Sequence, residues 1–134
     1  MSTYLVDNSI WQKAARSTRI TRRLRDVSTQ HLVMTCPPQV LEYCHSARNR
    51  ADYLLLRSHM EVLFPAIDHP SESDALVIQQ ALWMIGRVRA AAAFDCLIAA
   101  YAMRNDAIVL NSDRDFGHIA DAVGPGFRQE YVPE

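Results

Sequence analysis

Short apolar runs alternate with longer amphipathic stretches along the chain, which is the pattern of strands alternating with helices. The short runs predict buried strands at residues 3–7, 31–36 and 107–110, an edge strand at 127–132 and a further short strand at 66–69. The longer stretches predict helices at residues 10–27, 37–47, 50–64, 71–89, 94–105 and 115–123. Strands that alternate with helices form a mostly parallel sheet with both faces covered, so we expect an α/β fold.

Individual residues refine these elements. Ser9 is a candidate cap for the first helix, and Pro37 or Pro38 suits the start of the next. The stretch at 71–89 has one apolar face, made of Val77, Ala81, Met84, Ile85 and Val88. The stretch at 50–64 has core positions expected at Tyr53, Leu54, Leu56, Met60 and Leu63.

Size and composition favour one domain, predicted to span residues 1–134, because 134 residues that are 49% hydrophobic can build one core. The net charge of −1 argues neither for nor against nucleic acid as a partner. The basic residues are thirteen Arg and the single Lys13. Arginine binds phosphate and carboxylate with two parallel hydrogen bonds, which suits nucleic acid or an acidic partner, although GC-rich codons explain the same bias.

Cysteine usage and hydropathy indicate the compartment. The three Cys residues (Cys36, Cys44 and Cys96) are odd in number and lack CxxC spacing, which argues against a disulfide framework and against a zinc site. We therefore expect a protein of the reducing cytoplasm. No signal peptide is visible, and no apolar run approaches the ~18 residues that a membrane span needs, so no membrane is expected as a partner.

Acidic residues stand where strands end and helices begin. Asp7 follows the first strand, and Asp113 and Asp115 follow the strand at 107–110. Glu42 lies in the helix after the second strand, and Asp95 lies near the start of a helix. Ligands of open parallel sheets bind beyond the carboxyl ends of the strands. If the two strands are neighbours, these side chains converge at one edge of the sheet.

Such a cluster would need a cation, because gathered carboxylates repel one another and raise one another's pKa. Oxygen ligands without His or Cys at metal spacing point to Mg²⁺ or Mn²⁺. Each residue alone also has a structural explanation: Asp7 as a turn residue, Glu42 as a solvated helix residue, and Asp95 and Asp113 as helix caps. Their joint placement is what indicates a site.

Four motifs of the chain resemble those of PIN domains, specifically of VapC-type toxin ribonucleases. The resemblance lies in "YLVDNSIW", "PPQVLEYCHSARN", "FDCLIAAYAM" and "NSDRDFGHIA", and it runs over nearly the whole chain. The last two motifs are the most specific, and their aspartates, Asp95 and Asp113, are eighteen residues apart, a spacing that fits the resemblance. The resemblance implies a three-layer α/β/α sandwich around a parallel sheet of four to five strands.

The resemblance also implies roles for individual residues. Asp7, Glu42, Asp95 and Asp113 would form the catalytic set, with the metal on Asp7, Asp95 and Asp113. Ser9 and Asp115 would support that set. Toxins of this kind cut RNA with Mg²⁺ or Mn²⁺, usually as homodimers, and a cognate antitoxin holds them inactive, commonly by inserting an Arg near the acidic pocket.

The expected reaction is hydrolysis of an RNA phosphodiester bond, with water as nucleophile because the motifs hold no pair of histidines for 2′-hydroxyl chemistry. His118, the only His within a motif, is more simply a residue of the surface or core edge. Arginines crowd the first helix and its exit, at positions 16, 19, 22, 23 and 25, and some of them suit phosphate contact, with a solvated helix face as the alternative. The candidate phosphate contacts are Arg16, Arg23, Arg48, Arg50 and Arg114. Transfer or ribosomal RNA is the kind of target that the resemblance implies.

Three other functions fit an acidic sheet edge less well. A phospho-acceptor receiver domain needs a Lys at the last strand, whereas the one Lys of this chain is Lys13. A structure-specific DNA nuclease of the same fold usually carries insertions for which 134 residues leave no room. A non-catalytic PIN-like module that binds RNA or a partner remains the alternative, although all four acidic positions are filled.

Overall fold

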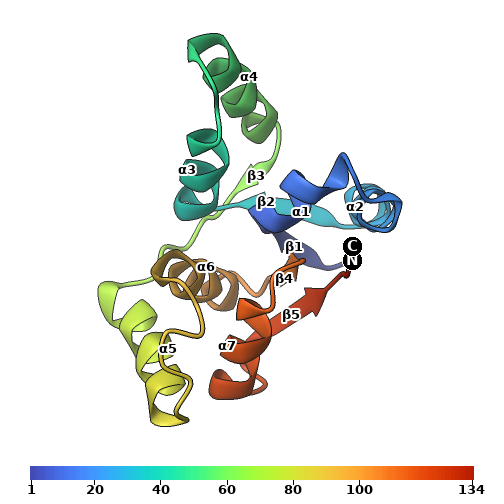
Figure 1. Ribbon diagram of the computed structural model, residues 1–134. Coiled ribbons are helices and arrows are strands. Elements are labelled where there is room, and N and C mark those ends of the chain that lie inside the picture. The colour runs from blue at the N-terminus through green and yellow to red at the C-terminus, as the bar shows by residue number, and fades with distance from the viewer.

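A computed structural model, which describes all of residues 1–134, contains a five-stranded parallel sheet with helices on both faces (Figure 1). The strands are β1 (Thr3–Val6), β2 (Leu32–Thr35), β3 (Phe64–Pro65), β4 (Ile108–Asn111) and β5 (Arg128–Tyr131). They lie in the order β3-β2-β1-β4-β5, and every neighbouring pair is parallel. The predicted α/β/α sandwich is confirmed, with β1 at its centre.

The helices divide between the two faces. They are α1 (Asn8–Ala14), α2 (Thr18–Gln30), α3 (Pro37–His45), α4 (Arg50–Glu61), α5 (Glu72–Met84), α6 (Ala93–Arg104) and α7 (Asp115–Val123). In Figure 1, α1 and α2 lie on one side of the sheet and α5, α6 and α7 on the other, while α3 and α4 extend beyond β2. None of the helices combines the length and the apolar character that crossing a bilayer requires.

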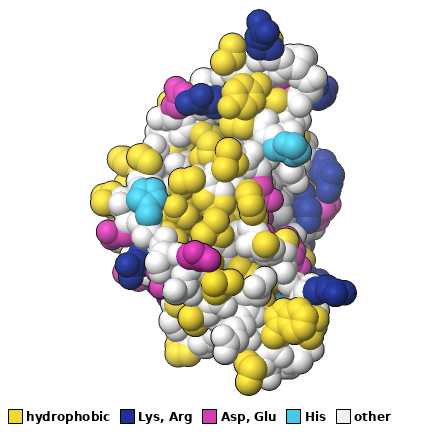
Figure 2. Space-filling view, turned by 90° about the vertical axis from the view of Figure 1, so that its left-hand side faces the viewer, with side chains coloured by type: hydrophobic (Ala, Val, Ile, Leu, Met, Phe, Trp, Pro, Cys, Tyr) yellow, Lys and Arg dark blue, Asp and Glu magenta, His cyan; other side chains and the backbone are white.

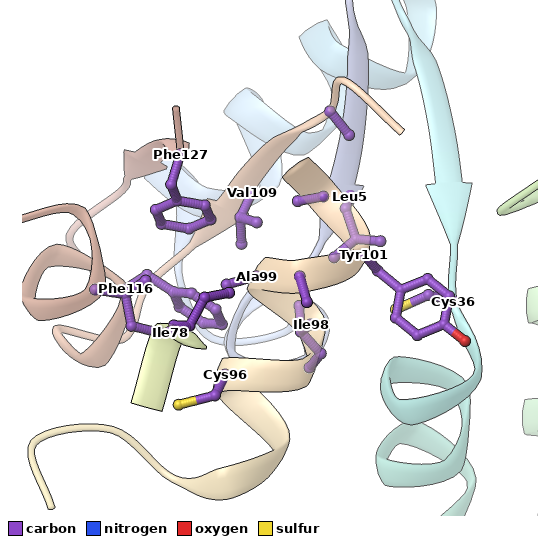
Figure 3. Packing of buried hydrophobic residues seen from close by; sticks show 14 of the residues in the cluster. Leu5, Cys36, Ile78, Cys96, Ile98, Ala99, Tyr101, Val109, Phe116 and Phe127 are labelled. Carbon is purple, nitrogen blue, oxygen red and sulfur yellow. The ribbon is translucent and has the colours of Figure 1, made fainter. Parts of the chain in front are cut away.

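Side chains of β1 contribute alternately to two hydrophobic cores, since neighbouring side chains of a strand point to opposite faces of the sheet. Leu5 belongs to the larger core under α6 and α7, whereas Tyr4 and Val6 belong to the smaller core under α1 and α2. In the larger core, the small side chains of α6, such as Ala99 and Ala102, are fully buried. Helix α6 therefore packs closely on the sheet, with larger side chains of α5, α7 and β4 around it (Figure 3).

Several predicted boundaries and one predicted helix cap differ from the structure. The stretch predicted as one helix over 10–27 forms two helices, because the Ser17 side chain accepts a hydrogen bond from the Ile20 N–H and caps a new helix, α2. Ser9 does not cap α1, since the cap is Asp7, whose side chain accepts from the Ser9 N–H. The short edge strand is β3 at 64–65 rather than 66–69.

The burial of α4 and α5 also differs from expectation. Tyr53 and Leu54, predicted as core positions of α4, are exposed. On α5 and beyond it, the predicted apolar face is exposed at four positions (Val77, Met84, Ile85 and Val88), because α5 packs inward through Ile78 and Leu82. We call the exposed apolar side chains of α4 and α5, which include Leu54, Leu55, Val77 and Met84, the apolar face. Figure 2 shows a gathering of hydrophobic side chains on one side of the molecule.

A charged network ties the edge strand β5 to β1 and α2. Arg23 donates two hydrogen bonds to the Glu130 carboxylate, at 2.6 Å from Nε and 3.0 Å from Nη2. The Tyr4 hydroxyl donates to the same carboxylate at 3.1 Å. Because Arg23 donates to it, the pKa of Glu130 is lowered from its ordinary value of 4.5.

Glu130→Gln is expected to lower the free energy of unfolding by about 1–2 kcal/mol at neutral pH, because Arg23 loses a half-buried ionic partner. A carboxyl whose pKa is lowered by folding stabilises the protein above its unfolded pKa, and this stabilisation is lost as the pH falls through the folded pKa. The difference between wild type and variant should therefore shrink below about pH 4.5. Urea unfolding measures it, with Glu61→Gln as control, since Glu61 is exposed and forms a long i,i+4 pair. An equal loss in both variants would contradict the assignment.

Candidate active site

The two central strands bring their following carboxylates to the same edge of the sheet. Val6 of β1 lies opposite Leu110 of β4, and the Asp7 N–H donates to the Leu110 carbonyl at 2.9 Å. Asp113 follows two residues after the end of β4. Helix α3 adds Glu42, and α6 adds Asp95. All of these side chains line one open cleft of about 830 Å³.

Three aspartates form a tight group within this cleft. The carboxylate oxygens of Asp95, Asp113 and Asp115 lie within 4.8 Å of one another. Asp95, in the first turn of α6, is only 6% exposed. The Asp115 N–H donates to Asp113 Oδ1 at 3.0 Å, which fixes the turn between β4 and α7. The structure thus places Asp115 in the group itself, as the positions after the strand predicted, whereas the family resemblance implied only a supporting role for it.

Ser9 connects Asp7 to the turn that carries Asp113. The Ser9 N–H and hydroxyl both donate to Asp7 Oδ2, at 3.0 and 2.7 Å. The same hydroxyl accepts a hydrogen bond from the Ser112 N–H at 2.9 Å. Ser9 therefore holds the Asp7 carboxylate and the β4–α7 turn in a fixed relation, and its supporting role in catalysis stays a prediction.

The carboxylates of the cleft raise one another's pKa. Burial in the first place, together with its neighbours Asp115, Asp7 and Asp113, raises the pKa of Asp95 to about 9. Burial also raises the pKa of Asp7 and of the half-buried Glu42, and the charge of Asp113 adds to both shifts. Each negative charge in the cleft is therefore costly in the absence of a counter-charge.

No Lys or Arg lines the cleft that could supply this counter-charge. The other lining residues are Asn8, Ser9, Gln12, Leu41, His45, Ser46, Ala92 and Phe94. The tight group of aspartates offers only hard oxygen ligands, the kind that Mg²⁺ and Mn²⁺ prefer. The residues present therefore fit a divalent metal ion of this class.

Several residues that position the site were not singled out from the sequence. Asn111, fully buried, donates to Gln129 Oε1 at 2.9 Å, and its own Oδ1 accepts from the Asp113 N–H at 3.2 Å. Lys13 donates to the Ser112 carbonyl at 2.7 Å. Both residues act through partners distant in sequence, so the only sequence signal was that Asn111 stands within the acidic motif.

A comparison with protein families identifies this architecture. The family model described as "PIN domain" matches residues 4–122, a range that includes all five carboxylates of the cleft. The chain belongs to the PIN domain family. A curated relative, Ribonuclease VapC6 of Mycobacterium tuberculosis, is 30% identical over 105 residues, which cover 77% of this chain and 83% of the relative.

Solved structures share the fold of this PIN domain at low sequence identity. A DNA-bound VapBC from Salmonella typhimurium contains a chain with a TM-score of 0.71 and 16% identity, and the match covers 98% of both chains. VapBC-5 from Mycobacterium tuberculosis, described as a member of the VapBC family of toxin-antitoxin systems, gives a TM-score of 0.66 and 18% identity, with complete coverage of both chains. The resemblance read from the four motifs is confirmed.

The arginines expected to contact RNA differ in availability within the PIN domain. Arg23 is held by Glu130, and Arg114 lies over the Tyr131 ring, 5.1 Å from its centroid. Arg16 pairs with Glu134 at 3.0 Å, and Arg48 lies 3.7 Å from Asp52. Arg50 is exposed without an ion pair. Contact with RNA stays a prediction for all five.

Neither of the histidines nearest the site forms a catalytic pair. His118 does not line the cleft, and its Nδ1 lies 3.1 Å from Nη1 of Arg87. His45, at the end of α3, is the one imidazole that lines the cleft. The arrangement therefore offers carboxylates rather than two imidazoles for proton transfer.

Proposed function

We propose that this PIN domain protein is a metal-dependent endoribonuclease and the toxin of a toxin–antitoxin pair. The observation that carries the proposal is the group of Asp95, Asp113 and Asp115 within 4.8 Å, in a cleft without Lys or Arg. The relation to Ribonuclease VapC6 supports RNA as the substrate. We infer that the whole chain acts as one domain, because α6 and α7, which carry the aspartates, pack on the same sheet as β5 near the chain's end.

The division of labour among the carboxylates follows from their positions. Mg²⁺ or Mn²⁺ would be held by Asp95, Asp113 and Asp115, with Asp7 beside them, and when bound it supplies positive charge that polarises a phosphodiester and stabilises its developing charge. Ser9 holds the Asp7 carboxylate in one orientation through two hydrogen bonds. Buried aspartates that are already oriented need little rearrangement when substrate enters.

Water is the nucleophile that the cleft favours, since His45 is its one imidazole and 2′-hydroxyl chemistry needs an acid–base pair. Glu42 lines the cleft, and its raised pKa makes its carboxylate a better proton acceptor than an ordinary glutamate. We infer that Glu42 takes the proton of the attacking water. The bond between phosphorus and the 3′-oxygen then breaks, and the 3′-oxygen takes up a proton from solvent water, which leaves a 5′-phosphate on one product and a 3′-hydroxyl on the other.

The purified protein is expected to cut a structured RNA in Mg²⁺ or Mn²⁺ and to lose this activity in EDTA. Asp113→Asn should abolish cleavage because it removes a member of the tight group, whereas Asp68→Asn, at an exposed position outside the cleft, should not. Gel analysis of end-labelled RNA with phosphatase treatment identifies the new ends. Products ending in 2′,3′-cyclic phosphate would rule out attack by water.

The apolar face supports a protein partner. Figure 2 shows hydrophobic side chains gathered in the middle of one side of the molecule, framed by scattered charged groups. The members of the apolar face include Leu54 and Leu55 of α4 and Val77 and Met84 of α5, each more than half exposed. Apolar patches of this kind mark interaction sites. We propose that the antitoxin covers this face, and that the free toxin forms a homodimer.

Growth of the natural host provides the test of the biological role. Induced alone, the protein is expected to arrest growth, and Asp7→Asn, at equal expression, is not. Co-expression of the protein encoded beside it should restore growth and form a complex that light scattering detects. Normal growth with well-expressed, RNA-cleaving protein would contradict the toxin role. A protein that binds RNA but never cuts it would favour the non-catalytic module instead.

A further inference from the structure

A row of arginines follows the corner between α1 and α2. Arg16, Arg19, Arg22 and Arg25 recur at every third position and are all exposed, while Ile20 and Val27 of the same helix are buried. Arg16 and Arg22 line two neighbouring polar hollows, which Arg19 and Arg25 extend at either end. We call these four residues the basic strip.

The basic strip is largely free of internal partners. Arg19, Arg22 and Arg25 form no ion pair and no hydrogen bond through their side chains, unlike Arg23 and Arg128, which are bound to carboxylates. Uncommitted guanidinium groups in a row repel one another, so their arrangement costs free energy unless an anion binds there. The strip therefore suits a partner with several evenly spaced negative charges.

The strip is continuous with the acidic cleft. Gln12 of α1 lines the cleft, and the next residue, Lys13, donates to the Ser112 carbonyl beside Asp113. Lys13 and Arg16 both approach the Glu134 carboxylate, at 3.6 and 3.0 Å. Positive groups thus begin at the turn that carries Asp113 and lead away from it along α2.

A polyanion that enters the cleft meets five carboxylates and needs positive charge nearby to offset the repulsion. We propose that the basic strip binds the phosphate backbone of RNA beside the bond that is cut, with Arg19 and Arg22 as the main contacts. The Glu134 carboxylate competes with the RNA for Lys13 and Arg16. This inference rests on the proposed function and gives the direction in which the substrate leaves the cleft.

Binding without cleavage tests the strip separately from the nuclease activity. The probe is a fluorescein-labelled single-stranded RNA of mixed sequence, and its anisotropy is followed over a salt series in EDTA, which keeps it intact. Arg19→Ala/Arg22→Ala is expected to weaken binding about tenfold. The slope of log K against log salt should fall by about 1.4, because each phosphate contact on a single strand contributes about 0.7.

A matched control removes the same total charge elsewhere. Arg57→Ala/Arg104→Ala changes two exposed arginines, one on α4 and one at the end of α6 opposite Asp95. This variant should bind RNA within about twofold of wild type and keep its salt slope. Equal losses in the two double variants would show general charge attraction and would overturn the proposal.

Glu134→Gln is expected to increase RNA affinity, a result that a misfolded variant would not give. Freeing Lys13 and Arg16 from the carboxylate is expected to raise RNA affinity about threefold. Unchanged or weaker binding would exclude competition by Glu134. The strip is not an RNA site if the wild-type protein binds no RNA. The same conclusion follows if unlabelled duplex DNA displaces the labelled RNA at a lower concentration of phosphate groups than unlabelled RNA does. If the wild-type protein binds RNA through the basic strip but does not cut it, only the proposed reaction is refuted.

Discussion

Replacing Asp95 by Asn is expected to reduce metal-dependent RNA cleavage at least a hundredfold while leaving the metal-free protein as stable as wild type, or more stable. Residues that merely support a metal ligand cost roughly 10–100-fold when changed, so a member of the tight group should cost more. Stability should not fall, because Asp95 is buried among like charges and Asn keeps its shape without its charge. A helix-capping residue would behave in the opposite way.

The pH dependence of this difference has a definite sign. In the metal-free protein the folded pKa of Asp95, about 9, lies above its ordinary value of 3.8, so the folded state binds the proton more tightly than the unfolded state. The resulting stabilisation is fully present below pH 3.8 and is lost as the pH rises through about 9. Asn has no proton to lose there. The melting temperature of the variant should therefore gain on wild type between neutral pH and about pH 9.

The same proteins are also melted in the presence of Mn²⁺. An ion that binds only the folded protein stabilises it by about 2.7 kcal/mol at a hundredfold excess over Kd. Wild type and Asp68→Asn should both show this gain in Mn²⁺, and Asp95→Asn should lose most of it. If Asp95→Asn melts well below wild type in EDTA and still gains as much from Mn²⁺, Asp95 is a structural residue and not a ligand.

Phe116→Ala is expected to have the largest effect on stability, a loss of about 3–5 kcal/mol in the free energy of unfolding. The Phe116 ring is fully buried, and its centroid lies 6.4 Å from that of Phe127 in the larger core. A loss of this size is a large part of the 5–15 kcal/mol that holds a domain folded. Urea unfolding gives the value directly.

The same substitution should weaken metal binding at the proposed site, since Phe116 directly follows Asp115 and anchors the first turn of α7. At a temperature where the variant is still folded, the Mn²⁺ concentration for half-maximal cleavage is expected to rise. Phe64→Ala is the control, because Phe64 is 59% exposed on the edge strand and its loss should cost less than about 1 kcal/mol. Equal effects at the two positions would mean that the core around α7 is not what holds the site.

The elements of the sheet and the site could be predicted from sequence because their signals are local. Helix α7 was predicted at its observed bounds, since strand-forming residues before it and Gly124 after it delimit it. Asp7 and Asp113 could be placed together because parallel strands end at a common edge. Nothing local indicated whether Asp115 or Asp7 lies closest to Asp95, which depends on how the β4–α7 turn folds.

The wrong predictions concern segments in which two local signals of similar strength compete. Helical propensity runs through residues 10–27, but Ser17 offers a cap, and the chain turns there to place α2 on the smaller core. Apolar periodicity along α5 identified a face but could not say whether this chain or a partner buries it. The inward residues Ile78 and Leu82 are fewer than the exposed apolar ones, so the face with more apolar residues is not the one that this chain buries.

The two edge strands of the sheet, β3 and β5, are poor sites for the addition of a strand from another copy of the protein. Strand β3 is only two residues long and ends in Pro65, which has no N–H to offer a further strand. At the other margin, β5 carries the exposed Arg128, while its Gln129 and Glu130 bind side chains of the sheet and of α2. Short, proline-ended or charged margins discourage strand addition. Even at the high local concentration of an overexpressed protein, misassembly into extended β-aggregates should therefore be disfavoured, and contacts between copies should form through helix side chains.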